Sequence, residues 1–168
     1  KLASAKGQNE ATFRTLLNFI ESSNPSRQGY SDRVASWMAL LVKPLGLPSE
    51  GIVQIAYLHD LGMPTAAALL PERLAVSQEQ LVLRHPFLAE QLAESLRLPL
   101  EVRLAVKHHH ENYDGSGYPD GLSGESIPLW GRLLRIVDTL VSLTSSVIPS
   151  GLGEKSLSAA EAHVQLKA

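Results

Sequence analysis

Apolar residues recur three or four positions apart along most of the 168-residue chain, and this spacing is typical of amphipathic α-helices. It predicts helices whose inward faces carry, in chain order, Phe13, Leu16, Leu17 and Ile20; Val34, Trp37, Met38 and Leu41; Ile52, Ile55, Ala56 and His59; Leu81, His85, Leu88 and Leu92; and Val102, Leu104 and Ala105. A further apolar helix is expected from Pro128 to Ser145. No stretch alternates in the way a β-strand requires. The pattern therefore predicts an all-α fold, a single compact helical bundle.

Capping and turn residues set the expected ends of these helices. Pro44 stops the second helix and Pro48-Ser49-Glu50 starts the third. Ser77 to Gln80 has the form of a capping box, and residues 112–128 are rich in glycine, serine and aspartate and are expected to form a loop. We expect three regions: an N-terminal helix over 1–25 that continues from an upstream region, a core over 26–145, and a linker with a C-terminal helix over 146–168.

Composition excludes several classes of function. The net charge of -2 argues against a basic surface for polymeric DNA or RNA. The chain has no cysteine, which excludes disulfides, thiolate metal sites and a cysteine nucleophile and fits a cytoplasmic location. No apolar run approaches the roughly 18 residues that a membrane-spanning helix needs, so we expect no membrane contact within this segment.

The candidate chemistry lies in the histidines. Five of the six histidines fall on or beside apolar helix faces, namely His59, His85, His108, His109 and His110. Asp60 follows the first of them directly, and Asp138 lies inside an otherwise apolar run, where an unpaired carboxylate would be strongly unfavourable. Imidazoles with carboxylates suit iron, manganese, zinc or nickel. Two such ions about 3.5–4 Å apart hold the oxygens of a phosphate ester during in-line attack.

Each of these residues also has a simpler interpretation. A single buried histidine is usually a hydrogen-bonded core residue. Three adjacent histidines also suit a solvated helix end, and Asp138 could be neutralised by Arg132 or Arg135. The conjunction of five histidines and two aspartates favours a metal centre over these separate explanations.

Four motifs occur in one order: HD at 59–60, HP at 85–86, HHExxDGxGYP at 109–119 and IPLxxR at 127–132. With these motifs the chain resembles the HD-GYP domain family over about residues 27 to 145. The resemblance implies an all-helical, metal-dependent phosphodiesterase of bacterial signalling that opens cyclic di-GMP to the linear dinucleotide. It also implies two divalent transition metal ions, iron or manganese.

The resemblance assigns residues to roles. One ion would be bound by Asp60, His85, His109 and His110, and the second by His59, Asp60 and Asp138. Asp60 and His59 would be the catalytic residues, with Asp60 bridging the two ions. His108 would face solvent or pack, because successive side chains on a helix diverge by about 100°. The loop and substrate-contacting residues would be Asp114, Gly117, Tyr118, Pro119 and Arg132.

The chain also departs from the family pattern. Tyr30 stands where the family has a further histidine ligand, and as phenolate it would be an extra ligand chiefly for ferric iron. Ser26 replaces a glutamate that helps hold a third ion in some members, and Met63 replaces a lysine expected near substrate phosphate. Val141 and the string SSVIPSG replace an aspartate and an arginine-bearing segment. We therefore expect a weaker second metal site and slow turnover.

Two other functions remain open at this point. The first is a catalytically weakened receptor or scaffold that binds metal or a signalling partner, such as a cyclase domain docked on the GYP loop, without turnover. The second is a general nucleotide phosphohydrolase that uses only His59, Asp60 and Asp138, which would leave the GYP string without a purpose.

Overall fold

The computed structural model describes residues 11–12, 14–15, 21–22, 27–61 and 78–144. These residues form helices and loops and contain no strand. The helices are α2 (Tyr30–Val42), α3 (Ile52–Leu58), α5 (Gln78–Ser95), α6 (Leu100–Lys107) and α7 (Leu129–Thr144), with a 3-10 turn at Gly124–Ser126. The prediction of an all-α fold is confirmed.

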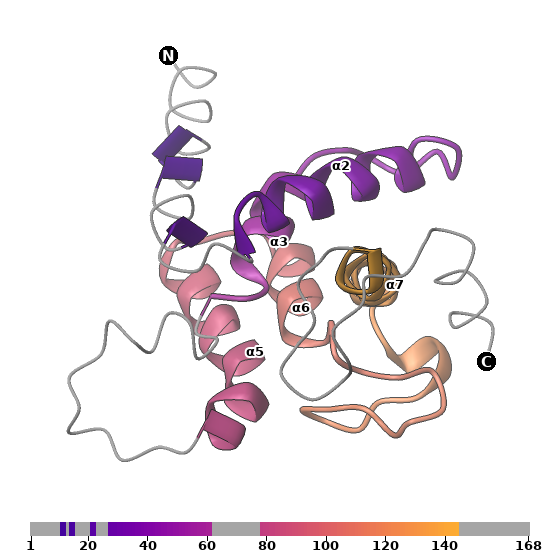
Figure 1. The fold of residues 1–168 in the computed structure, drawn as a ribbon. Coiled ribbons are helices and arrows are strands. Elements are labelled where there is room, and N and C mark those ends of the chain that lie inside the picture. The colour runs from indigo at the N-terminus through magenta and orange to yellow at the C-terminus, as the bar shows by residue number, and fades with distance from the viewer. Residues whose placement is uncertain (1–10, 13, 16–20, 23–26, 62–77, 145–168) are drawn as a thin grey trace.

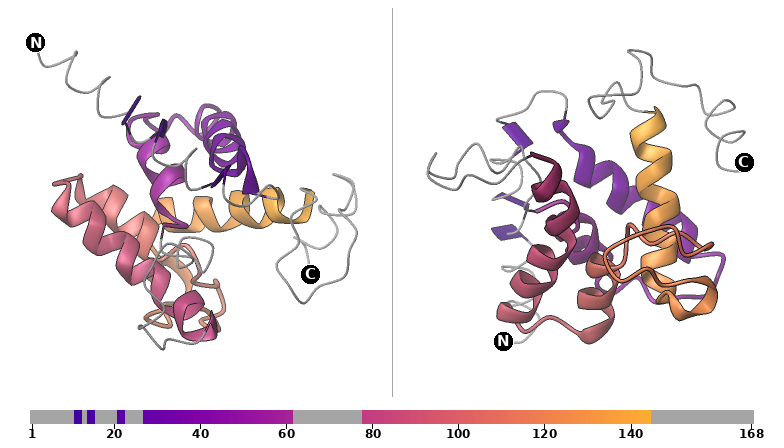
Figure 2. Two further views of the ribbon diagram at one scale, coloured as in Figure 1. Left: turned by 60° about the vertical axis from the view of Figure 1, so that its left-hand side comes forward. Right: turned by 90° about the horizontal axis from the view of Figure 1, so that it is seen from below.

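The helices pack around α3 and α6. Helix α2 packs on α3 and α7, whereas α6 packs on α5, α3 and α7 (Figure 1). Helices α5 and α6 lie side by side in both views of Figure 2. Arg103 on α6 joins them by donating to Glu90 Oε1 at 2.6 Å and Glu94 Oε1 at 2.7 Å, both on α5. None of the described helices is long and apolar enough to cross a membrane.

Two apolar clusters hold the helices together. The larger joins α2, α3, α6 and α7 and includes Val34, Met38, Ile55, Ala105 and Leu134. The smaller lies where α5 meets α6 and the end of α3, and it contains Leu58, Ala89, Ala93 and Val106. The predicted metal ligands belong to the same buried interior, so the packing that stabilises the bundle also sets their positions.

Some predicted helix faces need correction. Trp37 on α2 is nearly half exposed, and Val34, Met38 and Val42 form the buried face instead. On α5 the predicted Leu88 and Leu92 are exposed, while the buried face is made by His85, Ala89 and Ala93. Both faces have helical spacing, but only small side chains allow α5 to approach α6 closely, and periodicity favours the larger leucines. The face of Phe13, Leu16, Leu17 and Ile20, Ser77 of the capping box and the 146–168 region lie outside the described residues.

Glu21 ties the segment before α2 to the start of that helix. Its buried carboxylate Oε1 accepts hydrogen bonds from the Ser31 backbone N at 2.9 Å and from Ser31 Oγ at 2.7 Å. The N-cap residue, Gly29, has no side chain that could accept them. Glu21 therefore satisfies a first-turn donor of α2 directly beside Tyr30.

Helix α7 offers a test of this packing. Leu134 is fully buried, whereas Ile136 on the same helix is 49% exposed. Leu134→Ala should lower the free energy of unfolding by about 2–5 kcal/mol because it leaves a cavity in the core. Ile136→Ala should cost clearly less, because that side chain is half in water. Chemical denaturation of both variants measures the difference, and equal losses would contradict the described core.

Candidate metal centre

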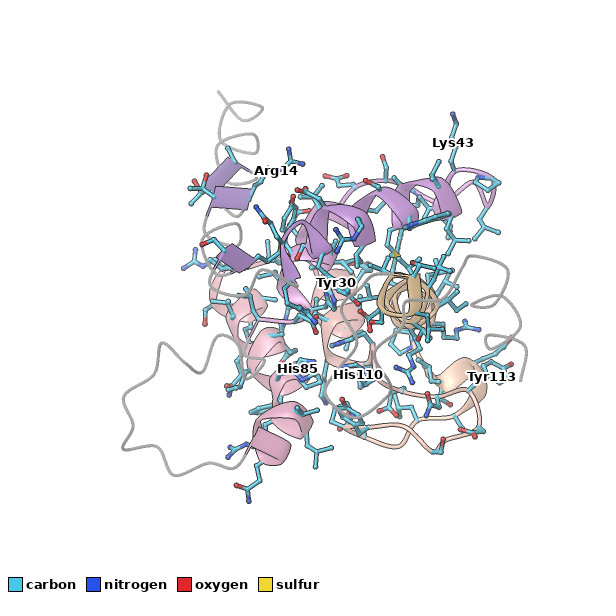
Figure 3. The ribbon with its side chains drawn as sticks, viewed as in Figure 1. Arg14, Tyr30, Lys43, His85, His110 and Tyr113 are labelled. Atoms are coloured by element: carbon cyan, nitrogen blue, oxygen red, sulfur yellow. The ribbon has the colours of Figure 1, made fainter. Side chains whose placement is uncertain are left out.

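Two groups of ligand-capable side chains meet in the interior, and they share Asp60. In each group the ligand atoms lie within 4.8 Å of one another; the first group is Asp60, His85, His109 and His110, and the second is His59, Asp60 and Asp138. Figure 3 shows Tyr30, His85 and His110 in this central region, with Tyr113 farther away on the loop. The resemblance to the HD-GYP family assigned the same six residues to the same two groups.

Three imidazoles are oriented by the helices that precede or carry them. In each, Nδ1 lies within hydrogen-bond distance of the backbone carbonyl three residues earlier: His59 and Ala56 at 2.8 Å, His85 and Val82 at 2.6 Å, His109 and Val106 at 2.7 Å. A carbonyl only accepts, so Nδ1 carries the proton and Nε2 keeps its lone pair. The Nε2 atoms of His85 and His109 then lie 3.2 Å apart, with both lone pairs available for a ligand.

The histidine triplet does not lie on a helix, which corrects one expectation. Helix α6 ends at Lys107, and His108 is its C-cap residue. The chain turns there, so the 100° divergence of helical neighbours does not apply to His109 and His110, whose ring centroids are 4.0 Å apart. His108 is buried, with Nδ1 3.6 Å from Glu111 Oε1. Of the two expected environments for His108, packing is the observed one.

His110 is held differently from the other imidazoles. Its ring stacks on Tyr118 with centroids 4.8 Å apart, and its Nδ1 lies 3.4 Å from Arg135 Nη1. A guanidinium only donates, so Nδ1 of His110 must accept from Arg135. In the neutral ring Nε2 then carries the proton, unlike in the rings whose Nδ1 donates to a backbone carbonyl. Arg135 also donates to Asn112 Oδ1, at 3.2 Å from Nε and 3.0 Å from Nη2. His110 is therefore the least preorganised of the four imidazoles.

The donor set fits a divalent transition metal. Burial lowers the pKa of His85 to about 4 and of His110 to about 3, and it lowers the pKa of His109 well below its ordinary value. These imidazoles are therefore neutral near pH 7, as metal ligands must be. The Nε2 atoms of His59 and His110 are buried without a hydrogen-bond partner among the described residues, which is costly unless another group binds them. An ion in the second group would satisfy the atom of His59, and an ion in the first group would satisfy that of His110 once its Nε2 proton is displaced.

Asp138 lies between His59 and Tyr30. Its Oδ1 is 3.4 Å from His59 Nε2 and accepts a hydrogen bond from the Tyr30 hydroxyl at 2.6 Å. Burial alone would raise the pKa of Asp138, but its polar surroundings outweigh burial and lower that pKa, so the carboxyl stays ionised. Arg135 donates to Asn112 instead, so the alternative pairing of Asp138 with that arginine is not observed.

Tyr30 is a hydrogen-bond donor in this arrangement. Burial, and then the charge of Asp138, raise the pKa of its hydroxyl, so the phenol keeps its proton. Its oxygen also lies 2.6 Å from Ser142 Oγ on α7. The contacts of Tyr30 favour positioning of Asp138 over service as a phenolate ligand.

The loop after the histidines is fixed against them by close backbone contacts. A Cβ on Gly117 would lie 2.5 Å from His110 O and from Glu111 Cα, and closer still to Asn112 N. Tyr118 donates its backbone N–H to His110 O at 3.2 Å, and the Tyr118–Pro119 peptide is cis. The loop therefore forms one wall of the centre beside His110.

Two predicted loop residues lie in other surroundings. Asp114 is exposed and accepts from Ser116 N at 2.9 Å and Ser116 Oγ at 2.6 Å, which lowers its pKa. It therefore stabilises the turn. Arg132 is partly buried, with an Nε that has no partner among the described residues. Of the positions that depart from the family pattern, Val141 packs in the core, whereas Ser26, Met63 and residues 145–151 lie outside the described residues.

Two residues of the centre were not predicted. Glu111 is buried and accepts from the backbone N of Asp120 at 2.8 Å and of Leu122 at 3.1 Å, so it holds the returning side of the loop. Its place inside the HHE string was an available signal. Arg27 forms an ion pair with Asp60 Oδ2, and no motif of the sequence pointed to it.

Known proteins resemble this chain over most of its length. A family model described as an HD domain matches residues 14–167. The cyclic di-GMP phosphodiesterase response regulator RpfG of Xanthomonas campestris is 35% identical over 143 residues, which are 80% of this chain and 38% of that protein. A Vibrio cholerae cyclic di-GMP phosphodiesterase is 31% identical over 134 residues, 71% of this chain and 27% of that protein. A 3'3'-cGAMP-specific phosphodiesterase of Vibrio cholerae is 28% identical over 132 residues, 75% of this chain and 29% of that protein.

The contact at Gly117 generates a prediction. Gly117→Ala should destabilise the fold by about 1–3 kcal/mol, because the added methyl group meets backbone atoms that cannot rotate away. It should also weaken metal binding, since His110 is one of those neighbours. Ser126→Ala, in an exposed part of the same loop, is the matched control and should change stability by no more than about 0.5 kcal/mol. Thermal unfolding and metal titration of both variants provide the test, and a wild-type-like Gly117→Ala would show that the loop is not fixed as described.

Proposed function

The chain belongs to the HD domain family, and on that premise we propose that it is a metal-dependent phosphodiesterase that hydrolyses cyclic di-GMP to the linear dinucleotide. The observation that carries the proposal is the pair of ligand groups joined at Asp60 in the interior of the bundle. The relatives named for cyclic di-GMP hydrolysis support the reaction class. The chain spans well under half the length of each of these relatives, so the substrate is part of the proposal.

The proposed metal ligands fall into the two groups that share Asp60. Membership of the family implies divalent metal binding, and the first group would hold an ion of iron or manganese through three imidazoles and Asp60. The second group would hold another ion more weakly, since it offers a single imidazole, His59, with two carboxylates. When bound, such ions supply positive charge to phosphoryl oxygens and make water more acidic.

The protein's own side chains would orient the reacting groups. Asp60 directs Oδ1 toward His85, at 3.7 Å, and Oδ2 toward His59, at 3.4 Å. Because both oxygens belong to one planar carboxylate, Asp60 would fix the position of one ligand group relative to the other. Asp60 and His59 are therefore the proposed catalytic residues. Tyr118, stacked on His110, presents an aromatic surface beside the centre that suits a nucleobase. The net charge of -2 provides no broad basic surface, so charges local to the centre would have to neutralise the substrate phosphates.

Relatives act on two kinds of cyclic dinucleotide, and both deserve testing. The names of the first two relatives specify cyclic di-GMP, and that of the third specifies 3'3'-cGAMP. The two compounds share the phosphodiester ring and differ in one base. We propose cyclic di-GMP as the substrate because the more similar relatives carry that name.

A receptor without turnover is the second candidate function. It is favoured by one observation: Tyr30 places a hydroxyl donor, and Arg27 a guanidinium, on the two carboxylates of the second ligand group. In that case the centre would bind metal or the dinucleotide, and the GYP loop would dock a partner such as a cyclase domain. The cyclic di-GMP assay below distinguishes the enzyme from the receptor. For either function, a cytoplasmic location stays a prediction.

Asp60 provides the first test of function. Asp60→Ala removes a ligand from both groups, so metal loading should fall and hydrolysis of cyclic di-GMP with Mn²⁺ or Fe²⁺ should drop by at least about 100-fold. Glu101→Ala, an exposed substitution on α6, should behave like the wild type in both measurements. Chromatography of the products identifies the linear dinucleotide, with 3'3'-cGAMP run in parallel. Hydrolysis retained in Asp60→Ala would place the reaction elsewhere, and metal binding without hydrolysis in the wild type would favour the receptor.

Tyr30 tests whether the departure from the family limits the rate. Tyr30→His replaces the donor on Asp138 with an imidazole, and turnover of cyclic di-GMP should rise because the second group gains a nitrogen ligand. Tyr30→Phe keeps the ring but loses the hydroxyl that binds Asp138, so it should give no such rise. If both variants keep the wild-type rate, the limit lies instead with Met63 or the residues after Asp138.

A further inference from the structure

Arg27 contacts the side of the shared carboxylate that faces the second ligand group. Asp60 Oδ1 faces the first group through His85, whereas Oδ2 lies 3.4 Å from His59 Nε2 of the second group. Arg27 Nη2 forms its ion pair with Oδ2. The guanidinium is therefore on the side where a second metal ion would bind Asp60.

The guanidinium is held in place from a second direction. Its central carbon lies 4.2 Å from the centroid of the Tyr30 ring, a cation–π distance. The side chains of Arg27 and Asp60 are only 18% and 13% exposed, unlike the solvated partners of a typical surface ion pair. Aromatic stacking and charge thus fix one positive charge beside Asp60.

The rest of the second group is engaged as well. The Tyr30 hydroxyl donates to Asp138 Oδ1, the same oxygen that lies 3.4 Å from His59. Each carboxylate of this group therefore already accepts from a donor, Asp60 from Arg27 and Asp138 from Tyr30. The first group differs: among the described residues no arginine contacts Asp60 Oδ1 or the Nε2 atoms of His85 and His109, and Arg135 lies 3.4 Å from Nδ1 of His110.

We infer that Arg27 is a resident cation of the second ligand group, in place of a second metal ion, so that the chain binds one transition metal ion tightly, at the first group. The inference rests on the proposed metal-dependent function and specifies the stoichiometry of its centre. A divalent ion entering the second group would meet the fixed guanidinium charge at close range and would have to displace it from Asp60. Tyr30 supports this arrangement twice, through its ring on Arg27 and its hydroxyl on Asp138.

Metal stoichiometry tests the inference without reference to activity. The full chain is stripped with a chelator and reloaded with Mn²⁺, and bound metal is counted by elemental analysis while electron paramagnetic resonance distinguishes isolated from spin-coupled ions. The wild type should bind one ion per chain with the spectrum of an isolated ion. Arg27→Ala and Arg27→Gln should bind two ions, with a spin-coupled spectrum. The dissociation constant of the second ion should be roughly tenfold or more lower than in the wild type.

Two control variants separate charge from structure. Arg27→Lys keeps the positive charge and should stay at one ion. Arg33→Ala removes a neighbouring arginine, 5.9 Å from the Tyr30 ring and bonded to Gln28 O, and should also stay at one. Circular dichroism confirms that each variant is folded, and the two neutral replacements provide independent measurements.

The outcomes distinguish the inference from the proposed function. Two tightly bound, coupled ions in the wild type, or one ion in both neutral variants, would overturn the role of Arg27 and leave the metal-dependent function standing. No tightly bound ion in the wild type or any variant would overturn both.

Discussion

The shared carboxylate of Asp60 is the constraint around which the centre is organised. One side chain at the end of α3 faces imidazoles from α5 and from the turn after α6 on one side, and His59 on the other. Burying these polar groups is unfavourable unless each finds a partner. The bundle must therefore bring four chain segments together: the end of α3, α5, the turn after α6, and α7 with Asp138. The packing of the two apolar clusters contributes favourable free energy that offsets the cost of burying these polar groups.

Burial also sets the chemistry of the ligands. Imidazoles removed from water lose their affinity for protons and remain neutral, and therefore able to bind metal, near pH 7. Asp138 stays ionised in the same interior because its polar surroundings outweigh the effect of burial on its pKa. The centre thus keeps neutral nitrogen donors and anionic oxygen donors together, which is the combination that divalent transition metals bind well.

Much of this could be predicted from the sequence, because the informative residues were unusual ones. Histidines and aspartates in apolar runs are rare enough to stand out, and their motif order led to the same six residues that the structure brings together. The packing faces were less predictable. Periodicity cannot tell that Ala89 and Ala93 pack inward while Leu88 and Leu92 do not, since the choice depends on how closely α6 approaches.

Residues that act through a single long-range contact escaped the sequence for another reason. Arg27 is one of many arginines, and its importance comes only from its distance to Asp60 and to the Tyr30 ring. The turn at His108 was not predicted either, since the helix was expected to continue through the histidines and instead ends at Lys107.

The carbonyl anchors of His59, His85 and His109 link ligand geometry to helix integrity. Each ring is oriented by a backbone oxygen one turn earlier, so fraying of that turn would release the ring, and occupation of the ring would in turn resist fraying. By thermodynamic reciprocity, the ends of α3 and α6 and the early part of α5 then become protected against local unfolding in proportion to ion occupancy. Amide hydrogen exchange at these three turns would in effect report how full the centre is.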